Sequence, residues 1–364
     1  MIKDCRKMND FRSYLRKLLE KEFYTSEILN TKIEAGEFLH EDFVELCEKH
    51  NGNRLIEYNI VELDKDVVMN NPYLKNIKIS IYQQGDVCLA RRRFIPAGTL
   101  IMYDEKLRNL DHFNQINSYC WCQHDVRFPA LIDEATGVCW MSVEPYEIST
   151  SNKFIESASG NVLLLGCGLG YFAYMLSLKN NVNKITIVDN NPNVIKLFQE
   201  KILCQFEQKD KIELVQSDAL EYMYRTNLST FDFVNVDIWR DVQDMVLTYL
   251  PCLEIEKNYP NTSFYYWDEG AFKEAIQKNV IGAACGFDKL FEGEIIRRIG
   301  EDIVQQTPIN SREDFQKLLK FDNLREILLE WYLNNKVEFE DLKKSESKHI
   351  DDIMETAKVF TKSK

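Results

Sequence analysis

The chain has 364 residues, of which 45% are hydrophobic and 28% are charged, with 14 Gly and 8 Pro. This composition excludes a collagen-like, low-complexity or largely disordered chain, and the length predicts two or three folding units. Asp and Glu number 58 against 45 Lys and Arg, which gives a net charge of −13. Because a protein that grips a phosphate backbone normally has a basic surface, we expect a small-molecule substrate and no nucleic-acid partner.

Neither a membrane span nor a secretory signal is expected. No stretch approaches the roughly 18 apolar residues that a span needs, and the first residues, MIKDCRKMNDF, are too polar for a signal peptide. We therefore expect a cytoplasmic protein with no membrane partner, whose 10 Cys are reduced thiols. The sequence does not specify an oligomeric state, and a homodimer stays open.

The first half of the chain predicts helices followed by strands. Over 1–54, apolar residues recur at the spacing of one helix face, namely Phe11, Tyr14, Leu15, Leu18 and Leu19. Over 55–143, short runs of strand-forming residues separated by turn signals predict a small antiparallel β domain. These runs are Ile77–Tyr82, Val87–Phe94, Thr99–Tyr103, Phe128–Ile132 and Val138–Val143, and the last two form a hairpin.

Residues 144–268 alternate apolar strands with helices. The predicted strands are Asn161–Leu165, Lys184–Val188, Ile212–Gln216, Phe233–Val236 and Ser263–Trp267. Strands without polar alternation, separated by helices, indicate a sheet that is covered on both faces. The predicted fold class is therefore α/β, with a Rossmann-like, doubly wound parallel sheet. Apolar helical spacing resumes afterwards and predicts a helical C-terminal extension over 269–364.

Four of these strands end in glycine or aspartate. The first runs into Gly166-Cys167-Gly168-Leu169-Gly170, where glycines let the chain turn tightly and let a ligand approach the backbone. The next three strands are followed by Asp189, Asp218 and Asp237. Open α/β sheets bind ligands at the carboxyl ends of their strands, so this set predicts a ligand site. Turn glycines and helix-capping aspartates explain each residue singly, but they explain the set poorly.

The arrangement resembles the class I S-adenosylmethionine-dependent methyltransferases, and within them the spermidine-synthase-like branch. The resemblance implies that the glycine turn faces the methionine portion of S-adenosylmethionine, that Asp189 holds the ribose hydroxyls and that Asp218 meets the adenine amino group. Pro145-Tyr146-Glu147 lies nearly where that branch has a Tyr-His-Glu stretch. The implied cofactor site consists of Gly166, Gly168, Leu169, Gly170, Asp189, Asn190, Asp218, Ala219 and Glu147.

A nicotinamide-binding Rossmann fold is the alternative for the same glycines. Its fingerprint usually places a small residue where the helix packs closely on the strand. Here Tyr171 and Phe172 follow the turn, and both are bulky. The turn and Asp218 together favour S-adenosylmethionine as the cofactor.

The residues after the fourth strand bear on the reaction. Aminopropyltransferases of the branch carry Asp-x-x-Asp-Pro there, whereas this chain has Asp237-Ile238-Trp239-Arg240-Asp241, with an arginine beside the site. The sequence therefore favours methyl transfer to a small-molecule acceptor, with Asp237 as the first catalytic candidate and Asp241 as the second. Aminopropyl transfer from decarboxylated S-adenosylmethionine, or a non-catalytic nucleoside-binding protein on the same fold, stay open.

One group of potential metal ligands is set aside. Cys120, Cys122 and His124, with His112 and Cys139 nearby, lack the paired C-x-x-C spacing of zinc sites. We predict no metal site.

Overall fold

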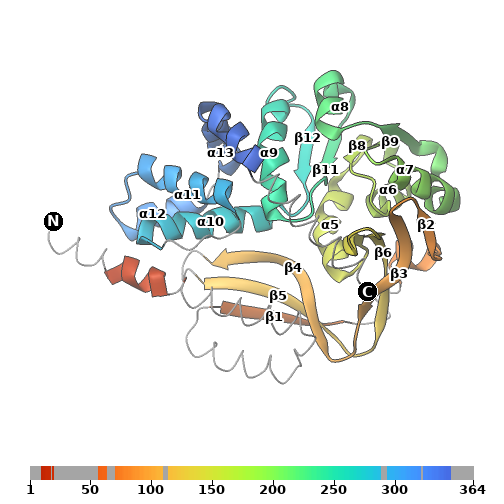
Figure 1. Cartoon of the computed structure of the whole chain (residues 1–364), viewed down its shortest axis with the longest axis horizontal. Coiled ribbons are helices and arrows are strands. Elements are labelled where there is room, and N and C mark those ends of the chain that lie inside the picture. The colour runs from red at the N-terminus through yellow and green to blue at the C-terminus, as the bar shows by residue number, and fades with distance from the viewer. Residues whose placement is uncertain are drawn as a thin grey trace.

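The structure, a computed structural model, describes residues 10–17, 19, 56–63, 70–109, 114–287, 293–320 and 323–345 (Figure 1). Most of the predicted N-terminal helical region and the residues after 345 lie outside this part of the chain. Residues 10–17 are helical, and Leu15 and Leu19 of the predicted apolar face are each 1% exposed. They belong to the same buried cluster as apolar residues of the C-terminal helices.

A five-stranded parallel sheet lies at the centre of the α/β region, in the order β10-β9-β8-β11-β12. Its strands are β8 (Gly160–Leu165), β9 (Val182–Asp189), β10 (Ile212–Gln216), β11 (Phe233–Val236) and β12 (Ser263–Tyr266). The strand order reverses between β8 and β11, and this switch point is where open α/β sheets bind ligands. The predicted α/β fold class is confirmed.

Helices cover both faces of this sheet. They are α5 (Pro145–Ser157), α6 (Tyr171–Ser177), α7 (Pro192–Leu197), α8 (Ala219–Arg225) and α9 (Val242–Glu256). Val162 and Leu164 of β8 belong to the buried cluster formed with α5, α6 and α7. Leu163 and Leu165 belong to the other cluster, formed with α8 and α9. Since successive strand residues point to opposite faces, an unbroken apolar strand buries both of its sides here.

Two smaller sheets precede the central one. The first has the order β2-β3-β6-β7, with β2 (Tyr82–Gln84), β3 (Val87–Ile95), β6 (Val126–Asp133) and β7 (Val138–Ser142), all antiparallel. The second has the order β1-β5-β4, with β1 (Ile56–Leu63), β4 (Thr99–Asn109) and β5 (Asn114–Cys122). The predicted hairpin is β6–β7. The long strand β4 lies beside α5 and the C-terminal helix α10 (Glu269–Cys285) (Figure 1).

Two details of the predicted β domain are wrong. β1 pairs with β5 in parallel, so the domain is not entirely antiparallel. The strand predicted at Ile77–Tyr82 begins only at Tyr82. Ile77 instead ends the short helix α4 (Pro72–Asn76), where its N–H donates to the Tyr73 carbonyl at 2.8 Å. Ile77 is apolar because it is fully buried at this helix end, not because it lies in a strand.

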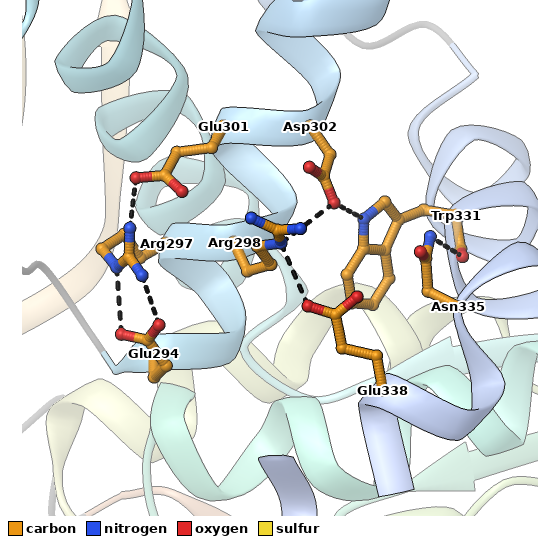
Figure 2. A network of polar contacts seen from close by, with 8 residues as sticks. All are labelled: Glu294, Arg297, Arg298, Glu301, Asp302, Trp331, Asn335 and Glu338. Atoms are coloured by element: carbon orange, nitrogen blue, oxygen red, sulfur yellow. Dashed lines mark hydrogen bonds and ion pairs between the residues drawn. The ribbon is translucent and has the colours of Figure 1, made fainter. Parts of the chain in front are cut away.

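Only helices follow β12 in the described residues. They are α10, α11 (Glu294–Gln306), α12 (Arg312–Lys320), α13 (Leu324–Asn334) and a helix over 336–345. Polar contacts join them, as Figure 2 shows: Asp302 accepts from the Trp331 indole at 2.9 Å, and Arg298 pairs with Glu338 at 3.2 Å. No described helix is long and apolar enough to cross a membrane. The domain boundaries at 54, 143 and 268 stay predictions.

Arg325 connects α13 to the α/β region. Its guanidinium donates to both carboxylate oxygens of Glu269 at 2.7 and 2.9 Å, and to Glu256 at 2.8 Å. Glu256 ends α9 and Glu269 begins α10, so one side chain joins three helices. The guanidinium also lies over the Tyr266 ring, 5.0 Å from its centroid.

We expect Arg325→Met to lower the free energy of unfolding by about 1 to 3 kcal/mol, between the effects of exposed and buried ion pairs. Two partly buried carboxylates would lose their shared cation. The matched control is Arg225→Met, because Arg225 pairs with Glu221 at 3.2 Å where both side chains are mostly exposed. It should cost less than about 0.5 kcal/mol. Urea unfolding of both variants measures the difference, and equal losses would contradict this role of Arg325.

Candidate functional site

The glycine turn lies between β8 and α6, at the switch point of the sheet. Gly166, Gly168 and Gly170 all have positive φ, at 99°, 47° and 68°. A Cβ atom on Gly166 would lie 2.0 Å from the carbonyl oxygen of Asp237. Only glycine therefore permits the close approach of the turn to the segment that follows β11.

Asp189 holds the turn from the neighbouring strand. Its carboxylate accepts hydrogen bonds from the Cys167 N–H at 2.9 Å and from the Asn191 N–H at 2.8 Å. Burial raises the pKa of Asp189, and these two N–H donors oppose that effect. Each carboxylate oxygen keeps a further lone pair, so the group can still accept from the hydroxyls of a ribose. Asn190, next to it, is exposed.

Asp218 and Ala219 lie one strand further along the same edge. The Asp218 carboxylate caps α8 by accepting the Glu221 N–H at 2.9 Å, and the residue is exposed. Ala219 is buried. The structure thus places Asp218 on the predicted edge and gives it a capping contact. Its contact with adenine stays a prediction.

Three carboxylates gather on the other side of the turn: Asp237 after β11, Glu147 on α5 and Asp268 after β12. Burial and then Asp268 raise the pKa of Asp237 from 3.8 to about 7. Burial raises the pKa of Glu147 well above its ordinary value, and Asp237, Glu144 and Asp268 add to this effect in that order. Glu147 is 6% exposed, and its Oε1 has no hydrogen-bond partner among the described residues. We call Glu147, Asp237 and Asp268 the acid cluster.

Asp268 is a candidate site residue that the sequence pattern did not single out. It is the one non-glycine residue with a positive φ, 60°, in the described part of the chain. Such a conformation costs on the order of 1 kcal/mol or more and is frequent at functional sites. The Tyr146 hydroxyl donates to its carboxylate at 2.6 Å, and the Tyr146 ring meets the Trp267 ring edge-on at 6.1 Å. Asp268 lies just after the fifth strand, so the pattern of aspartates at the strand ends could have identified it.

The second catalytic candidate, Asp241, has a different environment. Its carboxylate caps α9 by accepting the Asp244 N–H at 2.8 Å. Arg240 pairs with Asp244 at 3.2 Å, so its charge is directed to the same helix turn. These contacts account for Asp241 as a helix cap, and a catalytic role for it stays a prediction.

No group of three or more His, Cys, Asp or Glu in the described residues could hold a metal ion. Cys120 and Cys122 lie on β5, and both are fully buried. His112 lies outside the described residues.

A family model matches part of the chain that carries this geometry. Residues 150–234 match the Methyltransferase small domain. This part of the chain belongs to the class I S-adenosylmethionine-dependent methyltransferase superfamily. The matched segment contains the glycine turn, Asp189 and Asp218, and the recognition made from these residues is confirmed.

Two solved structures are similar at a low level. The spermidine synthase from Thermotoga maritima shares 16% identity at a TM-score of 0.30, and the match covers 42% of this chain and 59% of that chain. A spermidine synthase in complex with the transition state analogue AdoDATO shares 14% identity at a TM-score of 0.32, covering 49% and 70%. Neither similarity is high enough to carry a reaction over to this chain. No curated protein matches the chain.

We expect Gly166→Ala to cost more stability than Gly98→Ala. Gly98 also has a positive φ, 85°, but a Cβ there would meet only the Trp121 ring at 3.7 Å. The Gly98 variant therefore isolates the backbone cost, about 1 to 2 kcal/mol. The Gly166 variant adds a clash with the Asp237 carbonyl and should lose at least about 2 kcal/mol more. Chemical denaturation of both variants checks this, and equal losses would contradict the close approach.

Proposed function

We propose that this protein is an S-adenosylmethionine-dependent methyltransferase whose acceptor is a small molecule that carries an amine. The observation that supports this most directly is the contact between Gly166 and the Asp237 carbonyl. Through this contact the glycine turn, where we expect the cofactor, lies beside Asp237 of the acid cluster. A ligand on the turn and a cation in the acid cluster would thus be neighbours.

The residues present fit the cofactor. Three positive-φ glycines let a ligand approach the backbone, and Asp189 beside them retains lone pairs for ribose hydroxyls. Bound S-adenosylmethionine would supply an electrophilic methyl group on a positively charged sulfur. The protein must then mainly align the acceptor and exclude water, and no dedicated nucleophile is required.

The acid cluster suits a cationic acceptor. Three neighbouring carboxylates that are buried or partly buried repel one another, and a protonated amine would offset this repulsion. Before its nitrogen can be methylated, an ammonium must lose a proton, and Asp237 is our candidate to accept it. With a pKa of about 7, Asp237 is about half ionised at neutral pH, and its ionised form is basic enough to take a proton there. Tyr146 and Trp267 contribute aromatic walls.

Aminopropyl transfer from decarboxylated S-adenosylmethionine is the second candidate. One observation favours it: Asp268 provides a second carboxylate near Asp237, whereas no acid follows Asp237 at the Asp-x-x-Asp spacing. Arg240, whose positive charge would repel an amine, pairs with Asp244, and this ion pair weakens the repulsion. Both candidates use the same fold and the same edge of the sheet.

A product assay separates the candidates. The protein is incubated with either donor and a panel of monoamines and diamines. Release of S-adenosylhomocysteine supports methyl transfer, whereas release of methylthioadenosine at catalytic turnover supports aminopropyl transfer. If neither product forms and neither donor shifts the melting temperature, the non-catalytic alternative gains support, provided that another nucleoside binds.

We expect Asp189→Ala to weaken S-adenosylhomocysteine binding at least about tenfold, which corresponds to about 1.4 kcal/mol. The variant removes acceptors for ribose hydroxyls and also releases the Cys167 N–H of the turn. Asp210→Ala, at an exposed position, is the matched control and should bind as the wild type does. Isothermal titration calorimetry measures both constants, and an unchanged constant for Asp189→Ala would remove this residue from the site.

We expect Asp237→Asn to abolish transfer and to stabilise the protein at alkaline pH. Because the folded-state pKa of Asp237 is raised from 3.8 to about 7, its ionisation opposes folding. The contribution of protonated Asp237 to stability is fully present below about pH 4 and is lost as the pH rises towards 7. At pH 8 the variant should therefore gain about 1 to 2 kcal/mol over the wild type, with little gain at pH 4.

Urea unfolding at pH 4 and pH 8 measures this gain, and the control Asp210→Asn should change neither value. In wild-type enzyme, kcat/KM should rise with pH around a midpoint near 7. A pH-independent rate together with an active Asp237→Asn variant would argue against Asp237 as the base.

A further inference from the structure

A methionine from the β sheet lies directly on the glycine turn. Met141 belongs to β7, and its Sδ accepts the Leu169 N–H at 3.1 Å. A Cβ atom on Gly168 would lie 2.3 Å from the same sulfur. The thioether therefore fills the space that the absence of a side chain at Gly168 leaves open.

Most other polar groups of the turn are already paired within the protein. The Cys167 N–H donates to Asp189, and the Gly170 N–H donates to the Cys167 carbonyl at 2.8 Å. The Leu169 carbonyl accepts from the buried Tyr73 hydroxyl at 2.6 Å. Among the described residues, the Leu169 N–H donates to the thioether alone, and sulfur in methionine is a weak acceptor. A carboxylate is a far stronger acceptor for the same N–H.

Met141 can leave this position without a change in the sheet. Its backbone pairs with Leu131 of β6, so the strand is held in place. The side chain is only partly buried, and methionine has three rotatable bonds. Rotation of the side chain alone would expose Gly168 and release the Leu169 N–H.

We propose that Met141 is a plug of the cofactor site, which a ligand with an amino-acid tail must displace in order to bind. This inference rests on the proposed function, since the methionine portion of the cofactor is the group expected against the turn. A tail with a carboxylate replaces the thioether at the Leu169 N–H and displaces Met141. A nucleoside without the tail leaves Met141 where it is.

Two ligands and two variants test this proposal by calorimetry. Removal of the plug in Met141→Ala should tighten S-adenosylhomocysteine binding about three- to tenfold, because a weak hydrogen bond and its packing need not be broken. Methylthioadenosine, which lacks the tail, should bind wild type and Met141→Ala equally. The matched control is Met175→Ala, a partly buried methionine on α6, which should change neither constant.

A spectroscopic readout covers the case in which an alanine variant folds poorly. In protein with labelled methionine methyl groups, the Met141 signal is assigned by its absence in Met141→Leu. S-adenosylhomocysteine should shift that signal, and methylthioadenosine should leave it in place. The same result for both ligands overturns the proposal.

The outcomes separate this inference from the proposed function. Equal affinity of wild type and Met141→Ala for S-adenosylhomocysteine, with binding intact, overturns the plug and leaves the cofactor site standing. Loss of affinity in Met141→Ala would make Met141 a contact rather than a plug and also overturns it. If neither ligand binds wild type or any variant, the proposed function and the plug fail together.

Discussion

The approach of the glycine turn to the carbonyl of Asp237 is the constraint on which the site depends. It follows from the pairing of β8 with β11, where the Asp237 N–H donates to the Leu165 carbonyl at 3.0 Å. Any side chain at position 166 would separate these segments. A sheet covered on both faces leaves only the strand ends open to ligands, so cofactor-side and acceptor-side groups are forced into one small region.

The acid cluster is unfavourable for the fold by itself. Glu147 is buried, and its Oε1 has no hydrogen-bond partner among the described residues. Asp268 has a left-handed backbone conformation, and burial raises the pKa of Asp237. Elsewhere in the described chain, partly buried acids such as Glu256 and Glu269 have an arginine partner. Unfavourable local features are frequent where a function requires them, so the buried Glu147 and the left-handed Asp268 are consistent with the proposed acceptor site.

The sequence predicts the strand and turn that form the proposed cofactor side, but only part of the acid cluster. Val162–Leu165, the glycines and Asp189 are local patterns, because a buried strand and a tight turn each dictate residue type. The parallel pairing of β1 with β5 joins segments about fifty residues apart in a direction that no residue type encodes. Asp268 follows a strand, as Asp189, Asp218 and Asp237 do, but no local sequence pattern predicts its left-handed backbone conformation. Met141 reaches the turn only through tertiary packing.

The family match covers the residues of the proposed cofactor side and leaves out those of the acid cluster. Residues 150–234 contain the glycine turn, Asp189 and Asp218, and these are the groups expected on the cofactor. Tyr146, Glu147, Asp237 and Asp268, which surround the expected acceptor position, all lie outside the matched segment. Seven residues, from Met141 on the turn to Glu147 in the acid cluster, connect the two sides through the start of α5. Variation in this connection would change acceptor and cofactor selectivity together, while the matched segment could stay as it is.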